Sequence, residues 1–396
     1  REREREGERA AVDFLDGVHA VLGAQLVPHQ AFQPIERIDH HAFVIVLLDA
    51  KLVQRSDDFV VSRCQRELVA LDLVQAVLLL GGVLGPANVN RFGLAMCTGL
   101  VVLSLVPLTG WAGQVSLAPL AFAGVGAIAS SQLGGAEGHL WAVPLAGLVA
   151  VPVGAVLAIP ALRLQGLYLA LSTFAFATVA SSVLFAQPFA FAGQTIPTPR
   201  LSWFGISTSS GHAFLVLVSV TFAVFAIALA AAFHSRWGRR LVALRYSEVA
   251  SATVGVNLAE TKLIVFSLSA FVAGIAGVFT SMFYERTDAS AFQPLLGLTM
   301  VLALVIGGVS YLSGALYAGL FLVGLALLKE VWDTPLVRSI EYLGPGLAAL
   351  GIIANPDGAV VPIGRTFARL LPWRHDAKEA DAIRRAATRE PELGER

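Results

Sequence analysis

Long apolar runs, separated by short polar stretches, fill the chain from about residue 73 to residue 360. A membrane-spanning helix needs about 20 mostly apolar residues. Several runs are shorter or contain Gly or Pro, which spans tolerate when neighbouring groups satisfy the freed backbone. The pattern predicts an all-α polytopic integral membrane protein with about ten spans, some short or interrupted. The expected spans are residues 73–89, 92–110, 116–134, 140–160, 166–187, 212–233, 262–283, 295–312, 314–328 and 343–356.

Charged residues gather at the two ends of the chain. Only 14% of the 396 residues are charged, compared with about 25% in soluble domains. Residues 1–72 hold 9 basic and 13 acidic side chains, residues 73–360 hold 11 and 9, and residues 361–396 hold 8 and 6. We therefore expect a polar N-terminal segment, a transmembrane domain in a lipid bilayer over 73–360, and a charged tail over 361–396.

The basic residues of the links also predict an orientation. The link from residue 233 to residue 262 carries five basic and two acidic side chains, which places it in the cytoplasm by the positive-inside rule. Counting spans from it puts both termini in the cytoplasm and the links 188–211 and 284–294 outside. The predicted localisation is a bacterial-type plasma (inner) membrane.

The sequence offers no catalytic constellation. It contains no motif for a nucleotide-hydrolysing loop, a zinc protease or a serine hydrolase. No expected span carries Asp or Glu near its centre, where ion-coupled carriers place ionisable groups. Two cysteines, Cys64 and Cys97, cannot make a four-ligand zinc site, and a net charge of zero leaves no basic field for nucleic acid. We expect neither an enzyme nor a bound cofactor or metal.

Small residues recur inside the expected spans. They let helices approach closely, so helix packing is the favoured interpretation for most of them. The clearest examples are Gly124, Gly126, Gly147, Gly154, Ala270, Ala273, Gly274 and Gly277.

Two glycine-broken polar segments interrupt this apolar background. One is Gly110–Leu117 (GWAGQVSL) and the other is Gly307–Gly314 (GGVSYLSG). Paired interruptions of this kind point to a transport pathway. Two tight turns between helices are an equally weighted alternative.

The link over residues 235–257 predicts a short amphipathic cytoplasmic helix. Leu241, Leu244, Val249 and Ala252 recur near helical spacing between charged residues. Such a helix either lies on lipid headgroups or docks a soluble partner.

Four stretches together resemble one family. Gly110–Leu117 resembles its G-x-x-G-Q-x-S-L segment, and Gln165–Ala177 (QGLYLALSTFAFA) resembles its G-x-Y-x-A-x-x-T-x-A-F stretch. Ser235–Asn257 resembles its S-x-x-G-R-x-x-x-A-x-R loop, and Gly307–Gly319 its G-G-x-x-x-x-x-G segment. In this order they resemble the inner-membrane permeases of ATP-binding-cassette importers for branched-chain amino acids, of the LivM type.

The resemblance implies a permease subunit over 73–360 that forms the translocation path beside a second homologous permease subunit. Two separate cytoplasmic ATP-binding subunits would dock on the 235–257 loop and hydrolyse ATP, and an external substrate-binding protein would deliver a small amino acid. A cytoplasmic coupling helix would lie between spans six and seven. Gly238 would supply a turn into that helix.

Within this picture, three arginines would form ion pairs with the ATPase, while Leu241 and Leu244 would fill its groove. The coupling residues implied are Gly238, Arg239, Arg240, Leu241, Leu244, Arg245, Glu248 and Gly255. The candidates for the path are Gly110, Gly113, Gln114, Ser116, Thr173, Gly307, Gly308 and Gly314.

Some positions depart from the family pattern. Ala118-Pro119 replaces a glycine and a polar residue, and Phe191–Gln194 replaces a glycine-rich outer turn. The outer turn would face the delivery protein, so urea or short amides are alternative substrates. A stand-alone facilitative carrier or channel is the alternative class, because polar-poor spans permit facilitation.

Overall fold

The structure is a computed structural model that describes residues 86–134, 139–191, 195–200, 202–203, 206–207 and 210–331. Within these ranges the chain is mainly helical, as predicted. The helices are α3 (Pro86–Leu105), α4 (Pro119–Leu133), α5 (Ala142–Ala161), α6 (Gly166–Val179), α7 (Gly211–His234), α8 (Arg236–Tyr246), α9 (Glu248–Thr253), α10 (Leu258–Tyr284), α11 (Pro294–Gly307) and α12 (Leu312–Val331). Shorter helical turns are η1 (Val106–Trp111), η2 (Ala180–Leu184) and η3 (Ala289–Phe292).

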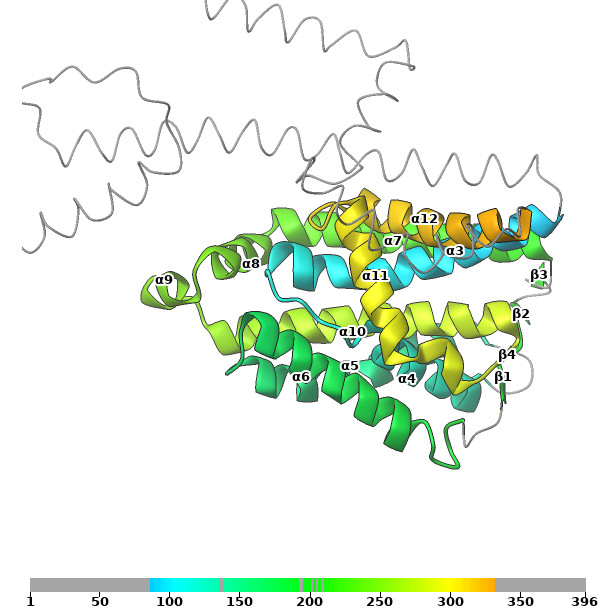
Figure 1. The fold of residues 1–396 in the computed structure, drawn as a ribbon, viewed down its shortest axis with the longest axis horizontal. Helices are drawn as coiled ribbons and strands as arrows, with labels where there is room; N and C mark the ends of the chain where they lie inside the picture. The colour runs from blue at the N-terminus through cyan, green and yellow to red at the C-terminus, as the bar shows by residue number, and fades with distance from the viewer. Residues whose placement is uncertain are drawn as a thin grey trace, which may run out of the picture. The chain divides into compact units, whose positions relative to one another are not determined.

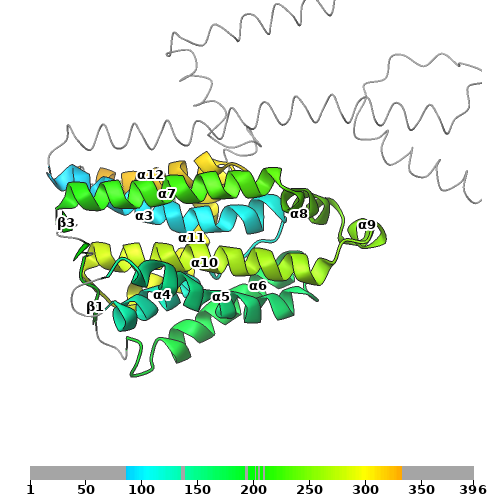
Figure 2. The ribbon, with the colours of Figure 1, turned by 180° about the vertical axis from the view of Figure 1, so that it is seen from behind.

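Helix α10 lies at the centre of the bundle. It packs against α4 and α5 on one side and against α3 on the other. Figures 1 and 2 show α3, α7 and α12 side by side in one layer and α4, α5 and α6 in a second, while α11 crosses obliquely. The long apolar helices thus bury their contact faces against one another.

The ends of the helices follow local chemistry. Helices α4 and α11 begin at Pro119 and Pro294, where the missing N–H and fixed φ of proline suit the first helical position. The Ser210 hydroxyl accepts a hydrogen bond from Ala213 N at the start of α7, as an N-cap does.

The small residues pack helix against helix, as predicted. A Cβ on Gly126 would overlap the backbone of Gly274, and a Cβ on Gly277 would overlap the backbone of Ala123. These positions bring α4 and α10 into backbone contact, which in a membrane supplies the packing energy that apolar burial does not.

The start of the first described helix corrects the predicted span boundaries. A break between residues 89 and 92 was expected, but α3 is continuous from Pro86 and η1 extends it to Trp111. Pro86 opens the helix instead of interrupting it, because a proline at the first position removes no intrahelical bond. The rest of the expected first span, the span 343–356, the N-terminal segment and the charged tail lie outside the described residues.

Five described helical segments are long and apolar enough to cross a membrane. They are Val89–Trp111, Ala142–Ala161, Gly166–Leu184, Gly211–His234 and Leu258–Tyr284. Three more, Pro119–Leu133, Pro294–Gly307 and Leu312–Gly324, are apolar but shorter. The all-α polytopic class is confirmed, while the count of about ten spans stays a prediction.

Four two-residue strands lie at one end of the bundle (Figure 1). β1 (Ile196–Pro197) pairs antiparallel with β4 (Arg286–Thr287), and β2 (Ser202–Trp203) pairs with β3 (Ile206–Ser207). The first pair joins the two links predicted to lie outside, and Arg200 Nε lies 3.1 Å from Glu285 Oε1 across the same junction. Helices α8 and α9 lie at the opposite end (Figure 1). This separation matches the predicted topology, although which end faces the cytoplasm stays a prediction.

Candidate functional site

The link between α7 and α10 folds into two short helices, whereas one amphipathic helix was expected. Ser247 is extended between them and its hydroxyl accepts from Ala250 N, so it ends α8 and caps α9. The predicted apolar stripe breaks there. Val249 is consequently 77% exposed instead of continuing the inward face of Leu241 and Leu244.

The two glycines of the link have different roles. Gly238 lies in the first turn of α8, where a Cβ would overlap the carbonyl oxygen of Phe233 at the end of α7. Its lack of a side chain therefore permits the sharp corner between α7 and α8. Gly255 has φ +87° and follows α9, so it supplies the left-handed turn that leads toward α10.

The inward face of α8 is apolar and belongs to this chain's own core. Leu241 and Leu244 are both buried there. Their predicted role in a groove of an ATPase stays a prediction, and in this chain both side chains pack into its own core.

The outward face of α8 and α9 presents arginines and apolar side chains. Arg239 and Arg240 are exposed, and the Arg240 guanidinium lies 4.8 Å from the centre of the Trp237 ring. Tyr246 is 85% exposed and Val254 is 83% exposed. We call Tyr246, Val249 and Val254 the exposed tip.

Arg245 joins α8 to both glycine-broken segments. Its Nη1 donates to the Gly110 carbonyl and, at 2.9 Å, to Ser310 Oγ. The Arg245 stem lies where a Cβ on Gly113 would be, 2.9 Å from Arg245 Cγ, and Gly113 itself has φ +68°. The sequence identified Arg245 but not this use, because its partners are 135 and 65 residues away.

The two glycine-broken segments contact each other directly. Trp111 Nε1 donates to the Ser310 carbonyl at 3.4 Å, and Ser310 Oγ donates to the Gly110 carbonyl at 3.3 Å. A Cβ on Gly110 would overlap the Val309 carbonyl. The structure thus brings together two segments that the sequence could only describe separately, and it adds Trp111 and Ser310 to the site.

The second segment makes the tight turn between α11 and α12. Gly308 has φ +111° and ends α11, and a Cβ on Gly307 would overlap the Gly314 backbone. The end of α11 therefore contacts the start of α12 through backbone atoms. This close approach requires glycine at these positions.

The first segment continues as a non-helical connector, residues 112–118, that leads from the end of η1 to α4 (Figure 1). Leu117 N donates to Thr173 Oγ1 at 2.9 Å, and that hydroxyl donates to the Ala170 carbonyl. Ser116 is buried, and its Oγ accepts weakly from Ala118 N at 3.4 Å. Thr173 thus holds the connector against α6, and its hydroxyl is already paired within the chain.

Gln114 is the polar exception in the connector. The residue is 6% exposed, and neither its Nε2 nor its Oε1 makes a hydrogen bond within the described residues. Each buried amide group left without a hydrogen bond costs about 1–3 kcal/mol. This arrangement favours a site where water or a solute completes the hydrogen bonds.

A second junction lies beneath α9. Lys262, 1% exposed, places its Nζ 2.8 Å from Glu248 Oε1 and donates to the Ala161 carbonyl at 3.1 Å. Gln165 Nε2 donates to Glu248 Oε2 at 2.6 Å. Glu248 therefore faces inward, and Lys262, one of the five basic residues counted in the link, is its buried partner. A lysine at the first residue of an expected span was the available signal, but its partners lie outside that helix.

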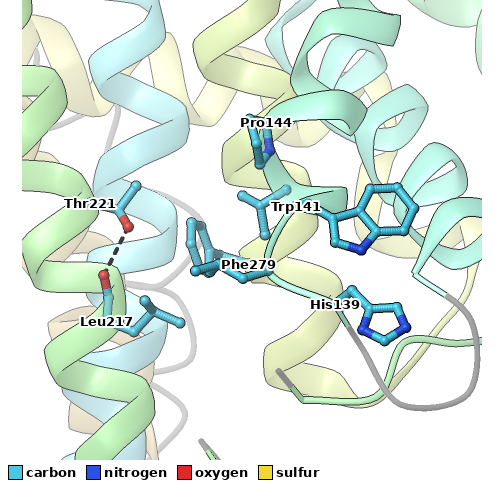
Figure 3. A pocket seen from close by; sticks show the side chains of 8 residues that line it. His139, Trp141, Pro144, Leu217, Thr221 and Phe279 are labelled. Carbon is cyan, nitrogen blue, oxygen red and sulfur yellow. Dashed lines mark hydrogen bonds between the residues drawn. The ribbon is translucent and has the colours of Figure 1, made fainter. Parts of the chain in front are cut away.

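A separate groove of about 420 Å³ lies between α5, α7 and α10, away from both junctions (Figure 3). His139 and Trp141 stack at 5.8 Å, and the Thr221 hydroxyl is already donated to the Leu217 carbonyl. The lining is otherwise apolar and includes none of the predicted site residues. It consists of His139, Leu140, Trp141, Val143, Pro144, Leu217, Thr221 and Phe279.

Three curated proteins show what this chain is similar to in sequence. The high-affinity branched-chain amino acid transport system permease protein LivM of Salmonella typhimurium LT2 is 26% identical over 355 residues, covering 81% of this chain and 82% of the relative. LivM of Escherichia coli K12 is 26% identical over 344 residues, covering 79% and 80%. The ribose import permease protein RbsC of Escherichia coli K12 is 32% identical over 126 residues, covering 31% and 37%.

No solved structure matches the chain. The family described as "Branched-chain amino acid transport system / permease component" matches residues 89–339. That match contains both junctions and both glycine-broken segments. The chain therefore belongs to the family of membrane permease components of branched-chain amino acid transport systems.

Proposed function

We propose that this chain is a translocating permease subunit of an ATP-driven importer, with a branched-chain (hydrophobic) amino acid as its substrate. It assembles with a second permease subunit, two ATP-binding subunits and an external binding protein. The observation that carries the proposal is the Arg245 junction, in a chain whose family is that of permease components. This junction connects α8, which has an exposed outer face, to both glycine-broken segments.

The ATP-binding subunit docks on the outward face of α8 and α9. The exposed tip offers the apolar contact, and Arg239 and Arg240 offer charge-assisted hydrogen bonds to carboxylates. Apolar residues that become buried at the centre of an interface contribute most of the binding energy. This end of the bundle faces the cytoplasm, in line with the basic residues of the link.

Movement of α8 then reaches the path through Arg245. The guanidinium holds the Gly110 carbonyl and the Ser310 hydroxyl, so a shift of α8 acts on both turns at once. The connector begins at the first of these turns and carries the Gln114 amide. The residues bordering the path are Gly110, Gly113, Gln114, Ser116, Thr173, Gly307, Gly308 and Gly314.

The Gln114 amide suits a zwitterionic solute. Its Nε2 can donate to a carboxylate and its Oε1 can accept from an ammonium group. A net hydrogen bond to a charged group contributes about 1.5–3 kcal/mol, so Gln114→Leu is expected to raise KM for uptake at least about tenfold. Gln132→Leu is the matched control, because it makes the same change at an exposed glutamine outside the path, whose Nε2 donates to the Phe189 carbonyl.

The decisive experiment measures uptake of labelled leucine into vesicles that hold this chain, the partner permease and the ATPases, with the binding protein supplied. A Val249→Asp, Val254→Asp variant tests docking, because both side chains are exposed and neither supports the fold. Glu260→Gln, an exposed change at the same end, is the control. Retention of the ATPases is expected to fall at least about tenfold in the double variant, since hot-spot truncation costs about 2 kcal/mol or more.

The outcomes separate the alternatives. ATP-dependent leucine uptake that is lost with the ATPases supports the importer. Uptake that persists without the ATPases makes the chain a facilitative carrier and overturns the proposal. If urea, a short amide or ribose moves instead of leucine, the importer class stands and the substrate is corrected. Ribose is included because of the partial similarity to RbsC.

A further inference from the structure

Lys262 is the one charged residue among the buried side chains of the described part of the chain. Removing an ammonium group from water is costly unless close partners compensate. Here the compensation comes from two other elements: the Glu248 carboxylate on α9 and the Ala161 carbonyl at the end of α5. The last carbonyls of a helix carry partial negative charge, which suits a cation.

Glu248 extends the same cluster to a fourth element. Its Oε2 accepts from Lys262 Nζ at 2.9 Å and from Gln165 Nε2 at 2.6 Å. Gln165 immediately precedes α6 and is its N-cap residue. Four elements, α5, α6, α9 and α10, therefore meet at one ion pair.

Helix α9 has few other attachments to the rest of the bundle. It is six residues long, and Val249 and Val254 at its two ends point away from the chain. Figure 1 shows α9 projecting beyond the ends of its neighbours. A helix this short is not stable by itself, so its position depends on its attachments.

We infer that the Glu248–Lys262 pair is a positioning link, which makes α5, α6 and α10 move with α9 when the ATP-binding subunit moves the exposed tip. The inference rests on the proposed function. Two residues of the segment between α7 and α10 then have separate roles. Arg245 connects α8 to the glycine-broken turns, and Glu248 connects α9 to the second layer of helices.

Charge removal separates this role from a purely structural one. Glu248→Gln leaves Lys262 buried without its anion and is expected to lower the melting temperature. The double variant Glu248→Leu, Lys262→Met removes both charges, and replacing a buried pair by apolar groups of similar size is often neutral for stability. The melting temperature of the double variant is expected to return toward wild type. The amount of leucine that it takes up per ATP hydrolysed is expected to stay low.

The test measures leucine taken up per ATP hydrolysed in the reconstituted importer, together with ATPase retention. In the double variant we expect normal retention and a fall of at least about fivefold in leucine per ATP, the lower end of typical couplings between sites. Glu285→Gln is the matched control, because it removes one charge from the ion pair with Arg200 at the opposite end. The control is expected to keep the wild-type ratio.

A second measurement needs no transport. Hydrogen exchange of the α9 amides in the purified chain is expected to be faster in the double variant than in wild type. The positioning role of the Glu248–Lys262 pair is overturned if hydrogen exchange in α9 is unchanged. It is also overturned if the stable double variant keeps the wild-type amount of leucine taken up per ATP. A wild-type importer that moves leucine without the ATPases refutes the proposed function instead, and faster exchange in α9 would still support the attachment.

Discussion

Substituting Gly154 by alanine tests the packing of α5 on α10 most directly. A Cβ at Gly154 would lie 2.5 Å from Ala270 Cβ and 2.8 Å from the Phe266 carbonyl oxygen. Carbon atoms in good contact are about 3.5–4.0 Å apart, so the two helices must separate by at least about 1 Å. Neither neighbour can turn aside, since one is a Cβ and the other is backbone.

The cost follows from that displacement. Overpacking a close interface typically costs about 1–3 kcal/mol, and a gap of about 0.5–1 Å forfeits a quarter to a half of each dispersion contact beside it. A loss of 1 kcal/mol lowers the melting temperature by about 2–4 °C in domains of about 150–250 residues. On that scale Gly154→Ala is expected to lower the apparent melting temperature by at most about 12 °C.

The assay is thermal unfolding in detergent at a fixed scan rate, because unfolding of such chains is a rate process. Gly324→Ala is the control, since a Cβ on this α12 glycine meets nothing within 4 Å. An unstrained Gly→Ala change in a helix stabilises by about 0.4–1 kcal/mol, so the control is expected to shift the other way. If Gly154→Ala melts at or above wild type, the described approach of α5 and α10 is wrong.

Three further predictions concern other parts of the bundle. Gly238→Val is expected to force open the corner between α7 and α8 and so to reduce co-purification of the ATPases. Gly255→Asn, at a left-handed position with open space around it, is expected to leave co-purification near wild type. Thr173→Val removes the acceptor for Leu117 N and leaves this partly buried N–H unpaired, which costs up to about 3 kcal/mol. Thermal unfolding should show the loss, and Thr173→Ser should restore the wild-type value. Cys97 is buried and free, so a maleimide is expected to label it only after denaturation, as mass spectrometry of a Cys64→Ser variant would show.

Part of the candidate site could be read from local sequence. The run from Ser235 to Gly255 indicated an exposed helical link, and the glycines near 110 and 308 indicated broken helices. Those features depend on neighbours within a few residues, such as a capping hydroxyl or a missing side chain, so a single sequence carries them.

The partners within the site could not be read in this way. Arg245 meets Ser310, and Lys262 meets Ala161, across 65 and 101 residues. The family resemblance implied that Leu241 meets an external groove, whereas in this fold its side chain lies in the core. Which of two faces becomes the inside is decided by the neighbouring helices.

By itself the sequence determined that this is an all-α membrane protein with small-residue helix contacts, because hydropathy and residue size act along one helix at a time. Only the tertiary structure decided that Leu241 and Leu244 face the core of this chain. It also decided that Lys262 is buried and that the two glycine-broken segments touch. These outcomes depend on desolvation and steric contact between distant segments, and both quantities are defined only after the helices have packed.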